Sequence, residues 1–222
     1  MTTPTPVRKS GSVFALGGRF TRIASNGAPV VGPDNAYVSD NLVKLDYTLE
    51  YRDGTEVERL NGQGKACLYY SSPPTVKRLV IDSLELCYPD PELEEMLGGG
   101  DVLLDEDGRP IGHAAPEVGS DPVPNGIGVE LWSSAITDDG VDDELPYIWW
   151  TLPRLYLKPS GVSISADPMA AAFEGQGNQN PNWGNGPLND WEWESGRVVQ
   201  RVRQATMPDL SANGFIAVPA AV

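Results

Sequence analysis

Residues 42–60 read LVKLDYTLEYRDGTEVERL, and this stretch alternates between apolar and polar side chains. From Val43 to Tyr51 every second residue is apolar, which places the apolar side chains on one face of an extended chain. The Asp-Gly pair at positions 53–54 then supplies a dipeptide that favours tight turns between strands. The stretch therefore predicts a β-hairpin with one apolar and one polar face.

The length of the turn sets the register of this hairpin. A three-residue loop at 52–54 pairs Leu49 with Val57 and Tyr51 with Thr55, which suits the apolar pattern better than a two-residue turn. Such a loop needs Gly54 in the left-handed conformation. The polar face then has a net charge of −3, from Lys44, Asp46, Glu50, Glu56 and Glu58.

The rest of the chain also predicts a mainly β protein. The 24 Gly and 20 Pro favour short strands joined by turns, and 222 residues suffice for one large domain without disulfides. We expect a flexible arm at residues 1–12 and a single β domain at 13–222, with a loop or insertion at 98–126 that holds at most a small hairpin about residues 106–108. Further strands are expected at 66–70, 76–88, 127–131, 147–158, 162–164 (after a turn at 159–161), 169–173, 198–202 and 215–218.

One short helix is expected after the strand at 76–88. Asp90 is a suitable N-cap, Pro91 suits the first helical position, and acids follow in the first turn. Gly98 ends the segment, and Leu93, Met96 and Leu97 mark the side that should pack on the sheet.

The formal net charge of −15 argues against tight nucleic-acid binding, because phosphate would approach an electronegative surface. The N-terminus lacks the layout of a signal peptide and no apolar run is long enough for a membrane span, so we expect a soluble cytosolic product and no membrane partner. Cys67 and Cys87 lie in apolar contexts and are expected to be small buried hydrophobes.

Catalytic machinery is not indicated. His113 is the single histidine and is expected in a solvated loop, and no nucleophile elbow, phosphate loop or dinucleotide fingerprint occurs. Acidic turns at 105–108 and 138–144 do not fit an EF-hand register, although a looser surface calcium site stays open. We predict no catalytic residue, no cofactor and no metal site.

Six tryptophans among many carboxylates leave a carbohydrate-related function open. The alternation at 190–194 places Trp191 and Trp193 on one face and three acids on the other, which favours a strand with buried tryptophans over a sugar platform. Of Trp149 and Trp150, one is expected in the core and the other against a neighbouring layer or subunit.

Three segments in order resemble a known family. They are LELCYPDPELEEMLGGG at 84–100, the aromatic YIWWTLPRL at 147–155, and NPNWG at 180–184 with the following GPLNDW. Their combination is similar to the major tail tube proteins of long-tailed (siphovirus) bacteriophages, of the actinobacteriophage type. The likeness spans roughly residues 42–193 and rests on the co-occurrence of the three segments.

The resemblance implies a β-sandwich-like barrel with one flanking helix and no enzymatic activity. It implies a structural virion protein, made in the host cytoplasm, that forms homohexameric rings stacked into the tail tube. Genome DNA would pass through the lumen during ejection without specific binding. The implied partners are other copies of the chain, the tape measure protein, the tail terminator and the distal tail protein.

Two sets of site residues follow from the resemblance. The acids Asp46, Glu50, Glu56 and Glu58 are candidates for the lumen face, with an ordinary solvent-facing sheet as the alternative. The candidates for intersubunit contact are Pro91, Leu93, Met96, Leu97 and Trp183. Three other functions stay open: a carbohydrate- or receptor-binding module of a phage tail, a related tail terminator or connector ring protein, and a glycoside hydrolase.

Overall fold

The computed structural model describes residues 11–88, 90–121, 123–138, 140–162, 170–188, 193 and 196–220. The fold is mainly β and is dominated by one antiparallel sheet with the strand order β14-β2-β1-β9-β11-β12-β6-β3. Two short strands complete it, β10 beside β9 and β13 beside β11. The strands are β1 (Gly11–Arg22), β2 (Gly32–Ser39), β3 (Leu42–Arg52), β6 (Thr75–Cys87), β9 (Ile127–Thr137), β10 (Gly140–Val141), β11 (Tyr147–Val162), β12 (Ala170–Gly177), β13 (Gln200–Gln204) and β14 (Gly214–Val218).

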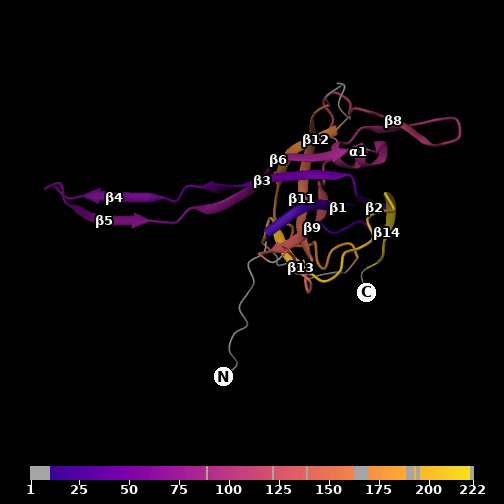
Figure 1. Cartoon of the computed structure of the whole chain (residues 1–222). Coiled ribbons are helices and arrows are strands. Elements are labelled where there is room, and N and C mark those ends of the chain that lie inside the picture. Colours follow the sequence, from indigo (N-terminus) through magenta and orange to yellow (C-terminus); the bar gives the residue numbers. More distant parts are fainter. Residues whose placement is uncertain are drawn as a thin grey trace.

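The sheet curls around its main apolar core, so that the last strand, β3, comes into contact with β1 (Figure 1). This core takes buried side chains from both ends of the strand order, including Phe20 of β1 and Leu84 of β6. A second cluster, built on the stacked rings of Trp132 and Trp149 at 6.1 Å, also contains Val38 and Leu210. Successive side chains of β9 point to opposite faces of the sheet, so Leu131 belongs to the main core and Trp132 to the second cluster.

The predicted helix is confirmed as α1 (Pro91–Gly98). The Asp90 carboxylate accepts a hydrogen bond of 3.0 Å from the Glu92 amide, as an N-cap residue does. Leu93, Met96 and Leu97 are all buried in the main core. The helix contacts β11 and the small sheet formed by β7 (Asp101–Leu104) and β8 (Pro110–Ala114), and that small sheet confirms the hairpin expected about residues 106–108.

Strands β1 and β2 were not predicted from the sequence. Glycines at 17 and 18 interrupt the pattern of β1, and four consecutive residues from Gly17 to Phe20 are buried, so the strand shows no polar face there. Gly18 is needed because an added Cβ would lie 2.7 Å from the Leu131 side chain. Close packing on both faces removes the alternation on which strand prediction depends.

The turn expected at 159–161 is wrong. β11 continues through it, and its pairing with β12 shifts between Pro159 and Gly161, as at a β-bulge. A bulge leaves one residue outside the ladder, which is where a proline without an amide hydrogen can be accommodated in a strand. The strand expected at 162–164 lies outside the described residues beyond Val162.

The hairpin predicted at 42–60 is also wrong in its pairing. β3 pairs with β6, with Leu49 opposite Leu79, and the chain then continues outward into β4 (Glu56–Leu60). β4 pairs with β5 (Ala66–Ser71), with Val57 opposite Tyr70, so the chain reverses only at residues 61–65. The result is a long two-stranded projection from the body of the molecule (Figure 1).

Gly54 has a different role from the one expected. It does not occupy a reversing turn; instead, a Cβ on this residue would lie 1.7 Å from the Ser72 carbonyl oxygen. The two strands approach closely here, and Thr55 and Ser72 bond through Thr55 N to Ser72 Oγ (2.8 Å) and Ser72 N to Thr55 O (3.0 Å). Pro73 and Pro74 lack amide hydrogens, so the regular ladder is interrupted at this point.

Cys67 contradicts the expectation of burial, because it is exposed, whereas Cys87 is half-buried. Cys67 lies on β5, and the two-stranded projection has no covering layer that could bury it. The sequence neighbours of Cys67 are indeed apolar, but they lie on an exposed strand and not in a core.

We predict that Gly128→Ala destabilises the fold. A Cβ at position 128 would lie 2.1 Å from the Trp183 ring, so this buried indole must move. The expected loss is about 1–3 kcal/mol in the free energy of unfolding, measured by urea denaturation. Gly62→Ala is the matched control, because nothing lies within 4 Å of its Cβ. A loss for Gly128→Ala no larger than that of the control would contradict the tight packing.

Candidate functional site

The most prominent surface feature is the projection at residues 51–77, which we call the arm. Every residue of β4 and β5 is exposed. The arm nevertheless carries seven large apolar side chains that are each at least 40 % exposed: Tyr51, Val57, Leu60, Leu68, Tyr69, Tyr70 and Val76. Such a density of exposed apolar residues marks an interaction surface in a folded protein.

The tip of the arm is locally well specified. Asn61 Oδ1 accepts hydrogen bonds of 3.0 Å from the amides of Gln63 and Lys65, and the Gly64 amide donates to the Asn61 carbonyl at 2.9 Å. Gly64 adopts a positive φ of 73°, which glycine tolerates without strain. The reversal at 61–65 is therefore a tight turn that its own hydrogen bonds hold in place.

The base of the arm is held by charge. Glu50 accepts from Lys77 at 2.5 Å and from Arg78, and these two cations hold the pKa of the Glu50 carboxyl below its ordinary value, Lys77 with the larger effect. Arg78 also donates to Gln176 of β12 at 2.5 Å. The root of the arm is thus tied to the sheet through side chains on three strands.

The arm differs from the rest of the chain in charge. Residues 51–77 contain four basic and three acidic side chains, a net charge of +1, so the remaining residues carry −16. The distal stretch 59–70 contains Arg59 and Lys65 and no acid. The tip of the arm therefore has a charge opposite to that of the rest of the chain.

The four candidate lumen acids lie at two places rather than on one hairpin face. Asp46 and Glu50 are on β3, where Asp46 is exposed and 3.4 Å from Lys44, and Lys44 also pairs with Glu85 at 2.9 Å. Glu56 and Glu58 are on β4 in the arm. Glu50 lies opposite Arg78, and not opposite Glu56 as the predicted register would place it.

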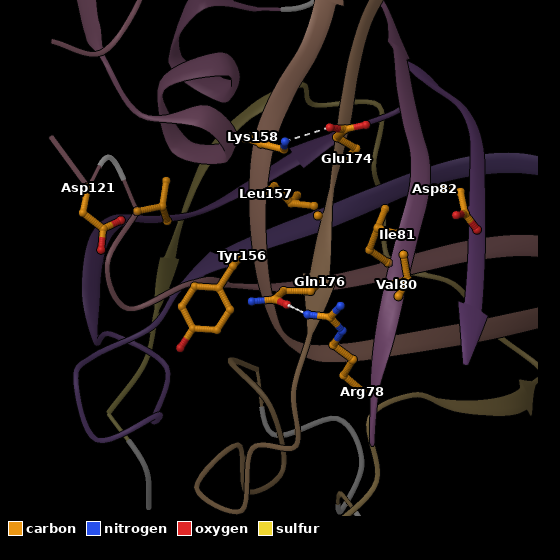
Figure 2. Close-up of a pocket in the computed structure, with 12 residues that line it drawn as sticks. Arg78, Val80, Ile81, Asp82, Asp121, Tyr156, Leu157, Lys158, Glu174 and Gln176 are labelled. Atoms are coloured by element: carbon orange, nitrogen blue, oxygen red, sulfur yellow. Dashed lines mark hydrogen bonds and ion pairs between the residues drawn. The ribbon is translucent and has the colours of Figure 1, made fainter. Parts of the chain in front are cut away.

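The outer face of β6, β12 and β11 next to these acids is hollowed, and the hollow is lined by both polar and apolar residues. Arg78, Tyr156, Gln176 and the ion pair Lys158–Glu174 line an open hollow of about 590 Å³. Figure 2 shows Lys158 paired with Glu174 and Arg78 bonded to Gln176, whereas Asp82 and Asp121 are not joined to any other residue drawn. An open surface of this kind, with charged and apolar side chains together, is suited to contact with solvent or with a partner, and its described lining residues hold no arrangement of groups typical of catalysis.

The residues expected at intersubunit contacts are mostly buried within the chain. Leu93, Met96, Leu97 and Trp183 are between 0 and 2 % exposed, which places them in the subunit's own core. Contacts within the chain account for these four side chains, whereas Pro91 is half-buried, and the five residues stay a prediction as intersubunit contacts.

The NPNWG segment is fixed by internal bonds. The buried Asn180 donates from Nδ2 to the carbonyl oxygens of Gly27 (2.7 Å) and Pro153 (2.9 Å), and Trp183 packs with Ile23 and Trp193. The residues 189–192 and 194–195 of the tryptophan and acid alternation lie outside the described residues. Within the chain, this loop closes the outer side of β9 against Gly128.

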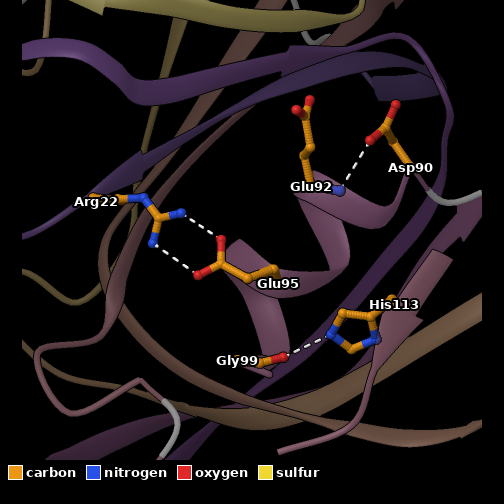
Figure 3. Close-up of polar contacts among 6 residues, drawn as sticks. All are labelled: Arg22, Asp90, Glu92, Glu95, Gly99 and His113. Atoms are coloured by element: carbon orange, nitrogen blue, oxygen red, sulfur yellow. Dashed lines mark hydrogen bonds and ion pairs between the residues drawn. The ribbon is translucent and has the colours of Figure 1, made fainter. Parts of the chain in front are cut away.

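His113 is not the solvated loop residue expected from sequence. It lies on β8, where a ring nitrogen at Nε2 donates to the Gly99 carbonyl at 2.8 Å and Nδ1 is 4.0 Å from Glu94. Burial raises the pKa of the Glu94 carboxyl, an effect that His113 opposes. Figure 3 shows this contact at the C-terminal end of α1, while Glu95 on the helix pairs with Arg22 of β1 at 2.5 Å. These contacts join the helix to its neighbours.

The acidic turns are explained by turn chemistry. Asp105 Oδ1 accepts from the amides of Asp107 and Arg109. Asp142 accepts from the amides of Glu144 and Leu145 at 3.0 and 2.9 Å and pairs with Arg203. Among the described residues, no group of three or more His, Cys, Asp or Glu side chains is arranged to hold a metal ion.

The tryptophans in the described part of the chain are mostly unavailable to a ligand. Trp132, Trp149, Trp183 and Trp193 are buried. The burial of Trp149 confirms the expectation that one tryptophan of the pair at 149–150 lies in the core. Trp150 is half-buried, with its ring edge-on to Tyr47 at 6.3 Å and its Nε1 donating to Ser133 at 2.9 Å. These aromatic rings serve packing.

No helix in the described ranges has the length and apolar character needed to cross a bilayer.

Comparison with known proteins gives little further information. The chain matches no protein-family model and none of the curated proteins. One similar solved structure is described as "Cryo-EM structure of the anti-feeding prophage (AFP) baseplate, 6-fold symmetrised". The similarity covers 80% of this chain and 94% of that chain at 13% sequence identity, with a TM-score of 0.28. This TM-score is too low to support an argument, so the function has to be inferred from the chain itself.

We predict a pH-dependent loss of stability for Asp142→Asn. The Leu145 amide, together with Arg203 and the Glu144 amide, holds the pKa of Asp142 below its ordinary value of 3.8. The folded state thus favours the ionised carboxyl, and its stabilisation is present above pH 3.8 and lost as the pH falls through the lowered folded pKa. Urea unfolding should show the variant less stable than the wild type at about pH 7, with the gap closing towards about pH 2.

Asp143→Asn is the control for this prediction, because Asp143 is adjacent and exposed. It should change stability by less than about 0.5 kcal/mol at neutral pH. A gap between Asp142→Asn and the wild type that stayed constant with pH would show that the charge of Asp142 is not the cause.

Proposed function

We propose that this chain is a structural phage tail protein, namely a major tail tube subunit that assembles with its own copies. In this proposal the copies form rings, with six as the expected number, and the rings stack into the channel for genome DNA. The subunit has no catalytic role and no cofactor. Support comes from the ordered set of sequence segments that resemble tail tube proteins, and from the mainly β fold with one flanking helix.

The arm is the observation that carries the proposal. A two-stranded hairpin without a third strand or a packing layer is marginally stable in water by itself. The arm is such a hairpin, and its apolar side chains are exposed along both strands. Tyrosine, which it presents three times at positions 51, 69 and 70, is enriched at protein interfaces because it buries much area at a low entropy cost. These properties suit a segment that becomes covered on assembly.

Electrostatics sets a further condition on such an assembly. At −15 per subunit, copies repel one another unless short-range apolar and backbone contacts outweigh the repulsion. An acidic channel would in turn repel the DNA backbone, so that DNA passes without adhering. We propose Asp46 and Glu50 on β3 as lumen residues, with Glu56 and Glu58 extending the acidic surface along the arm.

A tail terminator or connector ring is the related alternative. Such a protein would form single rings, whereas a tube subunit forms rings that stack. Negative-stain electron microscopy of the purified protein over a concentration series separates the two. Hollow tubes support the proposal, single rings support the alternative, and a persistent monomer over the series with no tubes on tail assembly in the host would reject both.

We predict that replacing apolar residues of the arm blocks assembly without unfolding the subunit. In Leu68→Ser/Tyr70→Ser the interface loses two large exposed side chains, so tube or ring formation should fall at least tenfold in microscopy and sedimentation. Because both side chains are exposed in the single chain, the thermal unfolding midpoint of the monomer should stay within about 2 °C of the wild type.

Leu103→Ser/Ile111→Ser is the matched control on the β7–β8 hairpin. Both of these side chains are also exposed, so the control removes similar apolar area elsewhere. Equal assembly by the arm variant and the wild type would count against the arm as the assembly element.

The lumen assignment leads to a separate prediction. Asp46→Lys replaces an exposed acid that has one weak partner, so tubes should still form. In phage particles that carry the variant, the new cation would attract DNA phosphate and slow ejection. Release of DNA from purified particles should slow severalfold at low salt and recover as the salt concentration rises. Asp107→Lys, an exposed acid on the β7–β8 hairpin, is the control, and identical release by both variants would be evidence against Asp46 as a lumen residue.

A further inference from the structure

The edges of β1 and β3 leave an open seam in the curled sheet. β1 pairs with β2 only from Gly18 onward, so in the described structure residues 11–17 bond to β9 on one side only. β3 pairs with β6 and, among the described strands, has no partner on its other edge. Both strands therefore present a free backbone edge where they face each other, which is a ready site for an added strand.

The seam is apolar and hollow. A space of about 240 Å³ lies between the two strands, with Leu131 of β9 and Trp150 of β11 at its base. Its rims carry two exposed apolar side chains, Phe14 on β1 and Val43 on β3. Ala15, Leu45, Tyr47 and Trp150, which all line the space, pack against the main core, so the seam is a gap at the margin of that core.

Phe14 shows that the backbone is strained at this rim. It has a positive φ of 55°, which is costly for a residue with a bulky side chain, and it stands where the β1–β9 register shifts between Val13 and Ala15. The conformation directs a large apolar side chain to a position that is 78% exposed. Strain that exposes an aromatic residue points to a use for that residue outside the subunit.

We propose that the seam between β1 and β3 receives the arm of a second copy of this chain. The inference rests on the proposed function, because it requires self-assembly. In this arrangement β5 of the incoming arm lies along the seam, and its side chains at Leu68 and Tyr70 fill the space beside Val43 and Trp150. The backbone of the arm extends a free strand edge by β-augmentation.

The occupant is a second copy because a subunit cannot fill its own seam. The arm is the direct continuation of β3, and it runs away from the body rather than back across it (Figure 1). The nine residues from 52 to 60 span about 30 Å when extended, which is enough to reach across to a neighbouring molecule. The seam strand β3 thus leads directly into β4, the first strand of the arm.

Charge favours the body of another copy over another arm. The distal arm carries Arg59 and Lys65 without an acid, so two arm tips repel each other. The residues outside the arm carry a net −16, and the one charged residue that lines the seam, Lys44, is paired with Asp46 and Glu85. Arm-to-seam contact is also heterologous, the type of contact that propagates into rings or helical stacks, whereas arm-to-arm contact stops at a dimer.

Cysteine cross-linking tests the proposal in the full-length protein. Cys87→Ser leaves Cys67 on β5 as the single native thiol, and Val43→Cys adds one on the seam. With a short bismaleimide, the assembled double variant should give a ladder of covalent oligomers beyond the dimer, whereas Cys87→Ser alone, with one thiol per chain, should stay almost entirely uncross-linked. Cys87→Ser/Ile111→Cys, with its new thiol exposed on β8, is the matched control and should give no ladder.

The native lysines provide an independent measurement that needs no substitution. An amine-reactive cross-linker applied to assembled wild-type protein should join Lys65 at the arm tip to Lys44 on the seam strand. Mixing ¹⁴N- and ¹⁵N-labelled copies shows by mass whether the link is between chains. Lys158, exposed on the outer sheet face, should give at least tenfold fewer links to Lys65.

The outcomes separate this inference from the function on which it rests. Suppose that tubes or rings form, but that Cys87→Ser/Val43→Cys gives no ladder and the wild type gives no link between Lys65 and Lys44. That result would overturn the seam as the docking site and leave the proposed function intact. A strong covalent dimer with Cys87→Ser alone, the largest product that one thiol per chain can give, would show that arms pair with arms, which also overturns it. Failure of the wild type to assemble under any condition, including tail assembly in the host, would reject both.

Discussion

The buried ion pair between Arg19 and Glu130 fixes the centre of the sheet. These residues lie directly opposite each other on β1 and β9, and the guanidinium bonds both carboxylate oxygens at 2.7 and 2.9 Å. Both side chains are fully buried, and the Arg19 guanidinium also lies over the Trp132 ring at 5.4 Å. A slip of one residue between the strands would place a charge in the apolar core, so the pair enforces one register at the expense of desolvation.

Other features follow from that register. Gly128 and Trp132 flank Glu130 on the same face of β9, and they receive Trp183 and Trp149, respectively. The loop that carries Trp183 also brings Gly186 close to Glu130. One row of residues along β9 therefore joins the NPNWG loop, the ion pair and the tryptophan stack. The body of the molecule is organised around this row, while the arm contributes nothing to it.

Local chemistry could be predicted from the sequence, and long-range pairing could not. The Asp90 cap, Pro91 and Gly98 specify the helix within a few residues of chain, and the alternation in β3 specifies an extended segment. The Asp53-Gly54 dipeptide indicates a reversing turn, but here its glycine allows two strands to approach closely. The segment that approaches it, at Ser72 and Pro73, is distant in sequence, so the local pattern does not indicate this contact. Exposed Val57, Leu68 and Tyr70 resembled core residues, because a strand pattern does not distinguish between burial within a chain and burial by a partner. The candidate acids were likewise assigned to one face through a register that the fold does not use.

The break in the ladder at Gly54 and Pro73-Pro74 has a mechanical consequence. On both sides of it the strands are regularly paired, but at the break only the bonds between Thr55 and Ser72 connect them. Bending is cheapest at such a point, so the arm has a hinge close to its root. In an assembly linked through these arms, each hinge would let neighbouring subunits tilt while their contacts stay intact. A long filament made in this way would combine a continuous wall with the ability to curve.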